Sequence, residues 1–339
     1  MGIRLALAGD TMLGRGVAQE LLAGRPPSRL VSAEVVEAAR AADLVLLNLE
    51  CCISERGQPW PRPDKPFFFR APPVAVETLV HLGVRCVTLA NNHALDFGEV
   101  ALLDTLRHLR AAGIAAVGAG TDEEAARGPV VLQAGGRRLA VLGVTDHPED
   151  FAAGPGRPGV AFADLRRGVP AWLLDAVREA RSRADLVLVT PHWGPNMAPE
   201  PVPHVRRAAA ALVDAGADLV AGHSAHVFQG VGERVLFDLG DFLDDYAADP
   251  VLRNDLGLLW LVDLEPGGPR EILGLPLRVQ YAHTRAADRE DARWIERRLR
   301  EACAPFGSRV DRRDGLLAVR RSSAMPRTSG GEGRSDAAE

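Results

Sequence analysis

Short apolar runs that end on polar residues recur along this chain, and they limit its fold more than any other feature. Each run is rich in valine, leucine and alanine and is bounded by turn residues, which is typical of strands buried on both faces of a sheet. The runs are IRLALAGD (3–10), ADLVLLNLE (42–50), RCVTLANNH (85–93), RLAVLGVTDH (138–147), ADLVLVTPHW (184–193) and ADLVAGHSAH (217–226). We therefore expect a buried sheet.

Helical patterns separate these runs. Segments 32–42, 98–113 and 202–217 each place apolar residues on one stripe, and the second ends on a glycine. The alternation of strand and helix predicts an α/β fold with a largely parallel sheet. After residue 226 come VLFDLGDFL, LGLLWLVDLE and ILGLPLRVQ, with one later helix at 288–304. We expect these late strands to close a second layer.

The domain organisation is expected to be simple. Residues 1–318 are predicted to form a single domain. Residues 319–339 are predicted to form a disordered C-terminal tail, because the end of the chain is rich in small and polar residues and has no periodicity.

Polar side chains stand at the carboxyl ends of the predicted strands. In parallel α/β sheets these ends face one crevice, where ligands bind. The terminal residues are Asp10, Glu50, Asn91, Asn92, His93, Asp146, His147, His192, His223 and His226. Carboxylates, amides and imidazoles are therefore expected to converge at one place.

Each of these residues also has an ordinary structural explanation. Asp10 follows a glycine and is equally suited to capping a helix or turn. Either Asn91 or Asn92 suits a turn, and His192 suits a hydrogen-bonded core position. Glu50 directly follows LVLLNL, so its carboxylate must be paired or bound to a ligand in a dry environment. The structural explanations do not account for the joint placement of these groups at the ends of separate strands.

The types of side chain indicate a catalytic metal site. Carboxylate, imidazole and amide donors without thiolates suit Mn, Fe or Zn, whereas structural zinc sites normally use cysteine. About six donors exceed the need of one ion. Two ions roughly 3.5–4 Å apart are a common arrangement for attack on phosphoryl groups.

Composition narrows the range of partners. The formal net charge is −5 and the pI is near 6.0, so no basic footprint for nucleic acid is present, and we expect a small or polymeric anionic substrate held by metal ions. The four cysteines have no CxxC spacing, which favours a reducing compartment. No segment is apolar for long enough to serve as a signal peptide or membrane anchor. We expect a cytoplasmic protein.

The motifs together resemble the CapA family, proteins of the capsule and poly-γ-glutamate synthesis type with the calcineurin-like metallophosphoesterase fold. The motifs that carry the resemblance run in order over residues 3 to 245: GDTMLGR, NLE, LANNHALDFG, GAGTDEEA, PHWG, DAGADLVAGHSAH and LGDF. The resemblance implies a four-layer α/β/β/α sandwich with a dinuclear metal centre between the two sheets.

The resemblance also implies roles for individual residues. By resemblance His93 would be the catalytic histidine. Independently of the resemblance, Arg15 follows the first strand, so it would either bind an anionic group of the substrate bidentately or be an ordinary surface arginine. The implied metal ligands are Asp10, Glu50, Asn92, His192, His223 and His226.

Three functions remain open at this stage. The first is a metal-dependent hydrolase that activates a bridging water on a phosphoester-like substrate, with His93 as the proton donor. The second is a CapA-type protein that acts on or binds an anionic polymer such as poly-γ-glutamate. The third is an amide or peptide hydrolase or ligase, because metal ions polarise a carbonyl as well as a phosphoryl group.

Some polar residues are expected to lie outside this chemistry. The pair Asp146 and His147 either extends the site or forms a turn before Pro148. The acidic residues of LGDFLDDY, which are Asp241, Asp244 and Asp245, are expected to form a solvated loop. His204 lies in a helical pattern and is given no chemical role.

Overall fold

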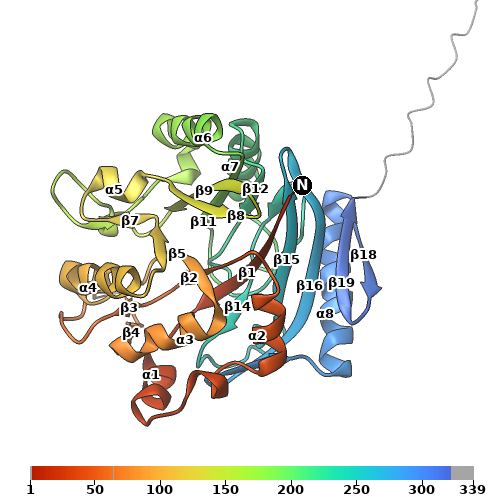
Figure 1. The fold of residues 1–339 in the computed structure, drawn as a ribbon, viewed down its shortest axis with the longest axis horizontal. Helices are drawn as coiled ribbons and strands as arrows, with labels where there is room; N and C mark the ends of the chain where they lie inside the picture. Colours follow the sequence, from red (N-terminus) through yellow and green to blue (C-terminus); the bar gives the residue numbers. More distant parts are fainter. Residues whose placement is uncertain (1, 64, 322–339) are drawn as a thin grey trace, which may run out of the picture.

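The computed structural model describes residues 2–63 and 65–321, and these form an α/β sandwich. Two sheets face each other, and helices cover the outer face of each sheet (Figure 1). The α/β/β/α arrangement expected from the sequence is therefore confirmed.

The first sheet has ten strands, parallel on one side of β1 and antiparallel on the other. Its central order is β18 (Ser308–Arg313), β19 (Leu316–Arg321), β16 (Gly268–Gln280), β15 (Leu256–Glu265), β1 (Ile3–Thr11), β2 (Leu44–Leu49), β5 (Val84–Thr88) and β6 (Ala115–Val117). Two further strands pair with internal strands of this sheet, with β14 (Asp241–Leu243) parallel to β1 and β17 (His283–Ala286) antiparallel to β16.

The second sheet has five strands and is parallel except for one edge strand. Its order is β13 (Val235–Leu236), β12 (Leu219–Ala221), β11 (Leu186–His192), β9 (Arg137–Thr145) and β8 (Val130–Ala134). Two small two-stranded pairs flank the sheets, β3 (Cys52–Ile53) with β4 (Arg70–Ala71) and β7 (Ala119–Gly120) with β10 (Gly159–Val160).

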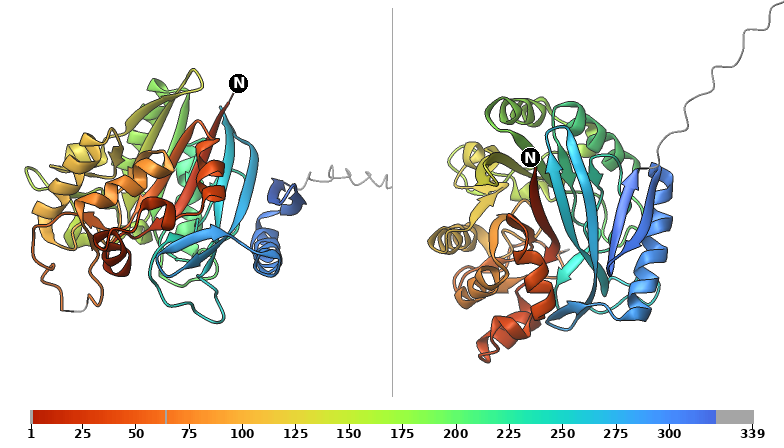
Figure 2. Two further views of the ribbon diagram at one scale, coloured as in Figure 1. Left: turned by 60° about the horizontal axis from the view of Figure 1, so that its bottom comes forward. Right: turned by 45° about the vertical axis from the view of Figure 1, so that its right-hand side comes forward.

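Helices form the outer layers. The first sheet is covered by α1 (Arg15–Leu22), α2 (Ala33–Arg40), α3 (Val76–Leu82) and α4 (Gly98–Ala111). The second sheet is covered by α6 (Ala171–Arg183) and α7 (Pro203–Asp214), while the short α5 (Glu123–Arg127) packs on β7 and β10. The last helix, α8 (Arg289–Cys303), packs beside β18 and β16 at the far end of the sandwich (Figure 2).

Alternation along β1 shows how the layers are held together. Ala6 and Ala8 pack toward the helices, whereas Ile3, Leu5 and Leu7 pack toward the second sheet. Successive side chains of a strand point to opposite faces, so a strand buried on both faces must be apolar throughout. All of these residues are buried, which explains the continuous apolar runs in the sequence.

The late strands differ from the expectation. They were expected to close a second layer, but β15 pairs antiparallel with β1 and β16 pairs with β15, so both extend the first sheet. Of the late strands only β13, from the run VLFDLGDFL, joins the second sheet, whose other strands are β8, β9, β11 and β12. A strand's own apolar pattern does not specify its partner, which explains the error.

The end of the chain is partly described. Strand β19 continues to Arg321, past the boundary at 318 expected from the sequence, and residues 322–339 of the expected tail lie outside the described residues. The division into one domain and a tail otherwise stays a prediction. Within residues 2–63 and 65–321, no helix has the length and apolar character needed to cross a membrane.

The junction of β1 and β14 brings two distant segments into close contact. The N–H of Asp10 donates to the carbonyl of Gly240 over 2.9 Å. A Cβ atom at Gly9 would lie only 1.7 Å from that carbonyl oxygen. The sequence GD at residues 9–10 is therefore required by backbone packing, and this packing fixes Asp10 opposite Asp241.

Replacing Gly9 by alanine tests this contact. We expect Gly9→Ala to lower the free energy of unfolding by about 1–3 kcal/mol, because the added methyl group must push two strands apart. Gly154→Ala is the control, since a Cβ there meets only ordinary contacts of 3.6 Å or more and the backbone is not left-handed. Urea denaturation followed by circular dichroism measures both variants, and equal stability of the two would contradict the account.

Candidate metal centre

The carboxyl ends of strands from both sheets meet at one edge of the sandwich. Strands β1, β2 and β5 bring Asp10, Glu50 and the loop that begins at Asn91 to this edge. Strands β11 and β12 bring His192 and His223 from the second sheet, and these two residues form a parallel bridge. The predicted convergence of strand ends is thus what the structure shows.

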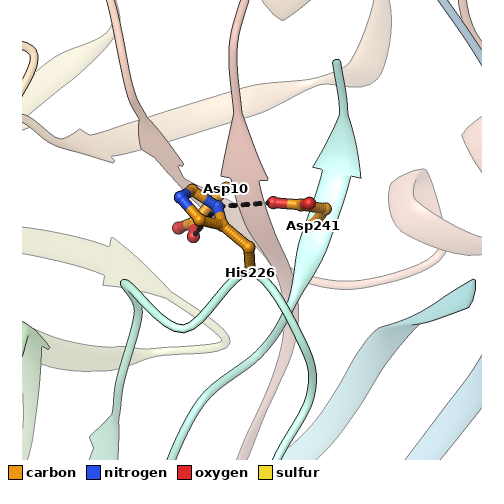
Figure 3. Close-up of side chains that lie close together, drawn as sticks. All are labelled: Asp10, His226 and Asp241. Atoms are coloured by element: carbon orange, nitrogen blue, oxygen red, sulfur yellow. Dashed lines mark hydrogen bonds and ion pairs between the residues drawn. The ribbon is translucent and has the colours of Figure 1, made fainter. Parts of the chain in front are cut away.

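One group of donors surrounds Asp10. Its Oδ1 lies 3.2 Å from His223 Nδ1, and its Oδ2 lies 3.3 Å from His226 Nδ1. His226 Nδ1 also lies 2.9 Å from Asp241 Oδ1 (Figure 3). Among the described histidine, cysteine and acidic residues, Asp10, His226 and Asp241 form the one set whose donor atoms all lie within 4.8 Å of one another. These three residues are a possible metal-binding triad.

A second group surrounds Glu50. Its Oε1 lies 3.5 Å from His192 Nε2 and 4.0 Å from His93 Nε2. Glu50 and His192 are fully buried. Neither carboxylate oxygen of Glu50 and neither ring nitrogen of His192 has a hydrogen-bond partner within the described part of the chain. The Oδ1 atom of Asn92 is likewise buried without a partner.

Unpaired buried polar atoms are the strongest sign that a ligand belongs here. Leaving a buried donor or acceptor unsatisfied costs about 1–3 kcal/mol, and more for a charged group. Folded proteins avoid this cost unless the group has a functional partner. Oxygen and nitrogen donors of this kind fit a divalent cation such as Mn, Fe or Zn.

The two asparagines have separate roles. Asn91 donates from Nδ2 to Asn48 Oδ1 and to the carbonyl of Leu49, and its own Oδ1 accepts the N–H of His93. Asn48 in turn donates to Asp10 Oδ1 over 2.8 Å. Asn91 is therefore a structural link between strand ends, which leaves Asn92 as the amide able to bind a ligand.

His93 is held by a buried carboxylate. Its Nδ1 lies 2.7 Å from Asp96 Oδ2, which also accepts the N–H of Phe69. Burial lowers the pKa of His93 to about 4, more than the neighbouring Asp96 raises it. The imidazole is therefore neutral near pH 7, and its Nε2 faces Glu50.

The other titratable groups respond to burial and to each other. Burial, then Asp10, raises the pKa of Glu50 well above its usual range. Burial lowers the pKa of His192 well below its usual range. Burial also acts to lower the pKa of His226, but Asp241 and Glu50 outweigh it and raise the value. The negative charge of the carboxylates at this centre therefore exceeds the positive charge that its imidazoles supply. Such an excess is expected for a cation site.

The loop after β12 is shaped for this purpose. A Cβ at Gly222 would lie 2.1 Å from the carbonyl oxygen of Phe237, so the strand must end on glycine. Ser224 and His226 have φ angles of 110° and 58°, which are uncommon for residues with a side chain. Asp238 holds the loop by accepting the N–H of Ala225. The strained turn aims His226 at Asp10.

An open cleft of about 930 Å³ lies beside the centre. Asn92 and His93 are among its lining residues, so the NNH motif borders the space that a substrate would enter. Arg15 is not among its lining residues. Instead Arg15 lies 3.2 Å from Asp245 and over the rings of Phe67 and Phe69, so its role in substrate binding stays a prediction.

The acidic residues of LGDFLDDY were expected to form a solvated loop, which is wrong. Asp241 and Asp244 are buried, and Asp245 accepts the N–H of Gly16. Asp241 lies with the donors because it begins β14, whose parallel pairing with β1 places it opposite Asp10, and the sequence gives no sign of that pairing.

Lys65 and Asp96 were also missed. Lys65 Nζ donates to the carbonyl of Asn92 over 2.7 Å and lies 2.9 Å from Asp96 Oδ1. Lys65 is the only lysine among the 40 lysine and arginine residues of the chain. This rarity is the one feature of the sequence that sets Lys65 apart. A compact ammonium suits this confined position better than a planar guanidinium. His204, given no role from the sequence, contacts Asp146.

Comparison with known proteins adds independent information. Residues 4–246 match the family model described as bacterial capsule synthesis protein PGA_cap. A probable polyglutamine synthesis accessory protein of Mycobacterium tuberculosis (strain H37Rv) is 33% identical, with 94% of this chain and 96% of that protein covered. The PGA biosynthesis protein CapA of Bacillus subtilis (strain 168) is 31% identical, with 71% of this chain and 63% of that protein covered.

Among solved structures, a hypothetical protein from Thermus thermophilus superposes with a TM-score of 0.47 at 19% identity. The superposition covers 81% of this chain and 99% of that one.

The buried state of His93 predicts a specific dependence of stability on pH. A histidine with a lower pKa in the folded than in the unfolded chain contributes its full stability above pH 6.5, and that contribution is lost as the pH falls toward 4. Between neutral pH and the folded-state pKa, we expect the free energy of unfolding to fall by about 3 kcal/mol less in His93→Gln than in wild type. Urea denaturation of both proteins with chelator, at neutral pH and near the folded-state pKa, measures the difference. An unchanged pH dependence in His93→Gln would contradict the assignment.

Proposed function

This chain belongs to the bacterial capsule synthesis protein PGA_cap family, and from that premise we propose that it is a metal-dependent hydrolase with a two-ion centre. The substrate is an anionic, phosphoester-like compound. The residues proposed to hold two divalent cations, Mn, Fe or Zn, are Asp10, Glu50, Asn92, His192, His223, His226 and the additional carboxylate Asp241.

One observation carries the proposal. Donor atoms of Glu50, Asn92 and His192 are buried without hydrogen-bond partners within the described residues, at the edge where they border Asp10 and its histidines. A polar cluster that served only stability would be paired internally. Donor atoms in two adjacent groups also support two ions in preference to one.

The division of the donors follows from their distances. Asp10, His226 and Asp241 form one set, and His223 Nδ1 borders it at Asp10. Glu50 and His192 form the other, and Asn92 is assigned to it because its Oδ1 atom is also buried without a partner in the described chain. Bound cations would act as Lewis acids toward a phosphoryl or carbonyl oxygen and would lower the pKa of a bound water.

His93 is the proposed proton-transfer residue. Because it is neutral at rest, with Nδ1 held by Asp96, its Nε2 can accept a proton from the attacking water and then deliver that proton to the leaving oxygen. An anionic substrate favours the charged imidazolium by attraction. Stacking of its ring on Phe69, with centroids 4.1 Å apart, keeps the orientation fixed.

Lys65 and Asp96 are proposed to position His93. Asp96 is fully buried and accepts from Phe69 while Lys65 balances its charge. Lys65 also fixes the backbone carbonyl of Asn92, so one ammonium links the amide ligand to the proton-transfer histidine. Arg15 is proposed to engage an anionic group only if it leaves Asp245.

The second candidate is action on an anionic polymer. The names of the relatives, which refer to polyglutamine synthesis and PGA biosynthesis, favour it. The cleft also suits it, because an opening of about 930 Å³ has room for more than one monomer and is lined by Arg62, Lys65 and Arg166. The same centre would then act on an amide carbonyl or hold carboxylates of the polymer.

A location in the cytoplasm is part of the proposal. The cysteines at 51, 52, 86 and 303 are all free and buried. Burial raises the pKa of Cys51 and Cys86 to about 12, so neither is a reactive thiolate. A reducing compartment suits such residues.

Turnover by metal-loaded protein tests the function. Protein reloaded with Mn, Fe or Zn is expected to release phosphate from members of a panel of phosphomonoesters and diesters. Asp241→Ala is expected to lose turnover and to bind Mn²⁺ at least about tenfold more weakly, because a buried donor is removed. Asp245→Ala is the matched control for metal binding, since Asp245 contacts Arg15 and Gly16 outside the donor set.

The outcomes separate the candidates. Wild-type protein that binds metal but cleaves γ-linked glutamate oligomers and no phosphoester would support the polymer function. Wild-type protein that retains no metal ion after incubation with Mn, Fe or Zn would contradict both candidate functions.

A further inference from the structure

We propose that His147, in the turn after β9, is an additional ligand of the divalent cation held by Glu50, Asn92 and His192. This inference rests on the proposed two-ion centre and deepens it by assigning one more imidazole donor to one of the two positions. The donor comes from a strand of the second sheet that supplies no other proposed ligand.

His147 lies beside His192. Its ring centroid is 5.1 Å from that of His192, with the planes inclined by 51°. It lines the same cleft as Asn92 and His93. Its strand, β9, pairs in parallel with β11, in register so that Thr145 lies opposite His192. The residues just beyond Thr145 therefore emerge at the same edge as the proposed ligands.

The orientation of His147 is set by a carboxylate. Its Nδ1 lies 2.5 Å from Asp146 Oδ1. Asp146 Oδ2 accepts the N–H of Gly194 over 3.0 Å, and this bond to the backbone holds the carboxylate in place. With Nδ1 held in this way, Nε2 is the atom left to bind a metal ion. Nε2 has no hydrogen-bond partner among the described residues.

This arrangement matches the way proteins prepare a histidine ligand. A ligating histidine usually donates its second ring N–H to a carboxylate, which fixes the tautomer and increases the basicity of the donor nitrogen. A structural histidine on the surface has no need of a buried carboxylate. Asp146 is almost fully buried, and a cation bound by His147 would offset the cost of burying its negative charge.

A second observation points to a missing ligand at this place. His192 is fully buried, and neither of its ring nitrogens has a hydrogen-bond partner in the described chain. Its Nε2 lies 3.5 Å from Glu50 Oε1, and its ring centroid lies 5.1 Å from that of His147. A cation bound by His192 and Glu50 would lie beside His147, whose side chain would have to move toward it, because the donor atoms of Glu50, His192 and His147 do not all lie within 4.8 Å of one another.

The resulting donor set is chemically consistent. Two imidazoles, one carboxylate and one amide oxygen satisfy four positions of a Zn, Mn or Fe ion and leave room for substrate. His204 serves as an internal comparison, because it contacts the same carboxylate but does not line the cleft.

Metal binding by the full-length chain tests the assignment without any substrate. Apo protein is titrated with Mn²⁺ by calorimetry, and bound ions are counted after dialysis. Wild-type protein is expected to bind two ions. His147→Ala is expected to bind the second ion about 10- to 100-fold more weakly, and Asp146→Asn to show a loss in the lower part of that range. His204→Ala is expected to bind both ions like wild type.

A spectroscopic reading protects the test against a folding defect. Co²⁺-loaded His147→Gln is expected to show an altered ligand-field band near the visible region while its circular dichroism and melting temperature match those of wild type. Two-ion binding by His147→Ala with unchanged affinity and an unchanged Co²⁺ band would overturn this inference and leave the two-ion centre standing. An equal loss in His204→Ala would also overturn it, because the effect would then come from the Asp146 turn. Wild-type protein that bound no ion would overturn the proposed function as well.

Discussion

The structure depends on how buried charged and polar groups are accommodated where two sheets end. Glu50, His192 and Asp241 lie in a dry environment in which an unpaired charge would destabilise the fold by several kcal/mol. Ten- and five-stranded sheets supply enough apolar contact to hold these groups in place. A divalent cation would pair with these groups and remove the cost of burying them unpaired. Metal binding would therefore stabilise the folded chain.

The backbone around this edge is fixed by close contacts and hydrogen bonds. Gly9 and Gly222 permit approaches that any side chain would block, and Asn48 and Asn91 connect neighbouring strand ends. Positive φ angles at Ser224 and His226 add local strain that the surrounding core must offset. Such preorganisation holds donor atoms in position before a ligand arrives, which is what tight and selective metal binding requires.

Much of this organisation follows from local sequence. Buried strands leave continuous apolar runs, and the polar residue that ends each run marks the ligand edge, so Asp10, Glu50 and His192 could be located without coordinates. Pairing between distant segments could not be predicted. Asp241 acquires its role because β14 pairs with β1 across some 230 residues of chain, and β15 joins the first sheet for a similar reason. Lys65 lies in a segment without regular structure, where periodicity carries no information.

The central claim is that donors from both sheets gather around two cations. Anomalous X-ray diffraction from crystals grown with Mn²⁺ tests it most directly, because it locates the ions without reference to any assay. We expect two peaks roughly 3.5–4 Å apart. One should lie against Asp10, His226 and Asp241, and the other against Glu50, Asn92 and His192. Crystals that bound no manganese at this edge of the sandwich, or bound it only elsewhere on the molecule, would contradict the account.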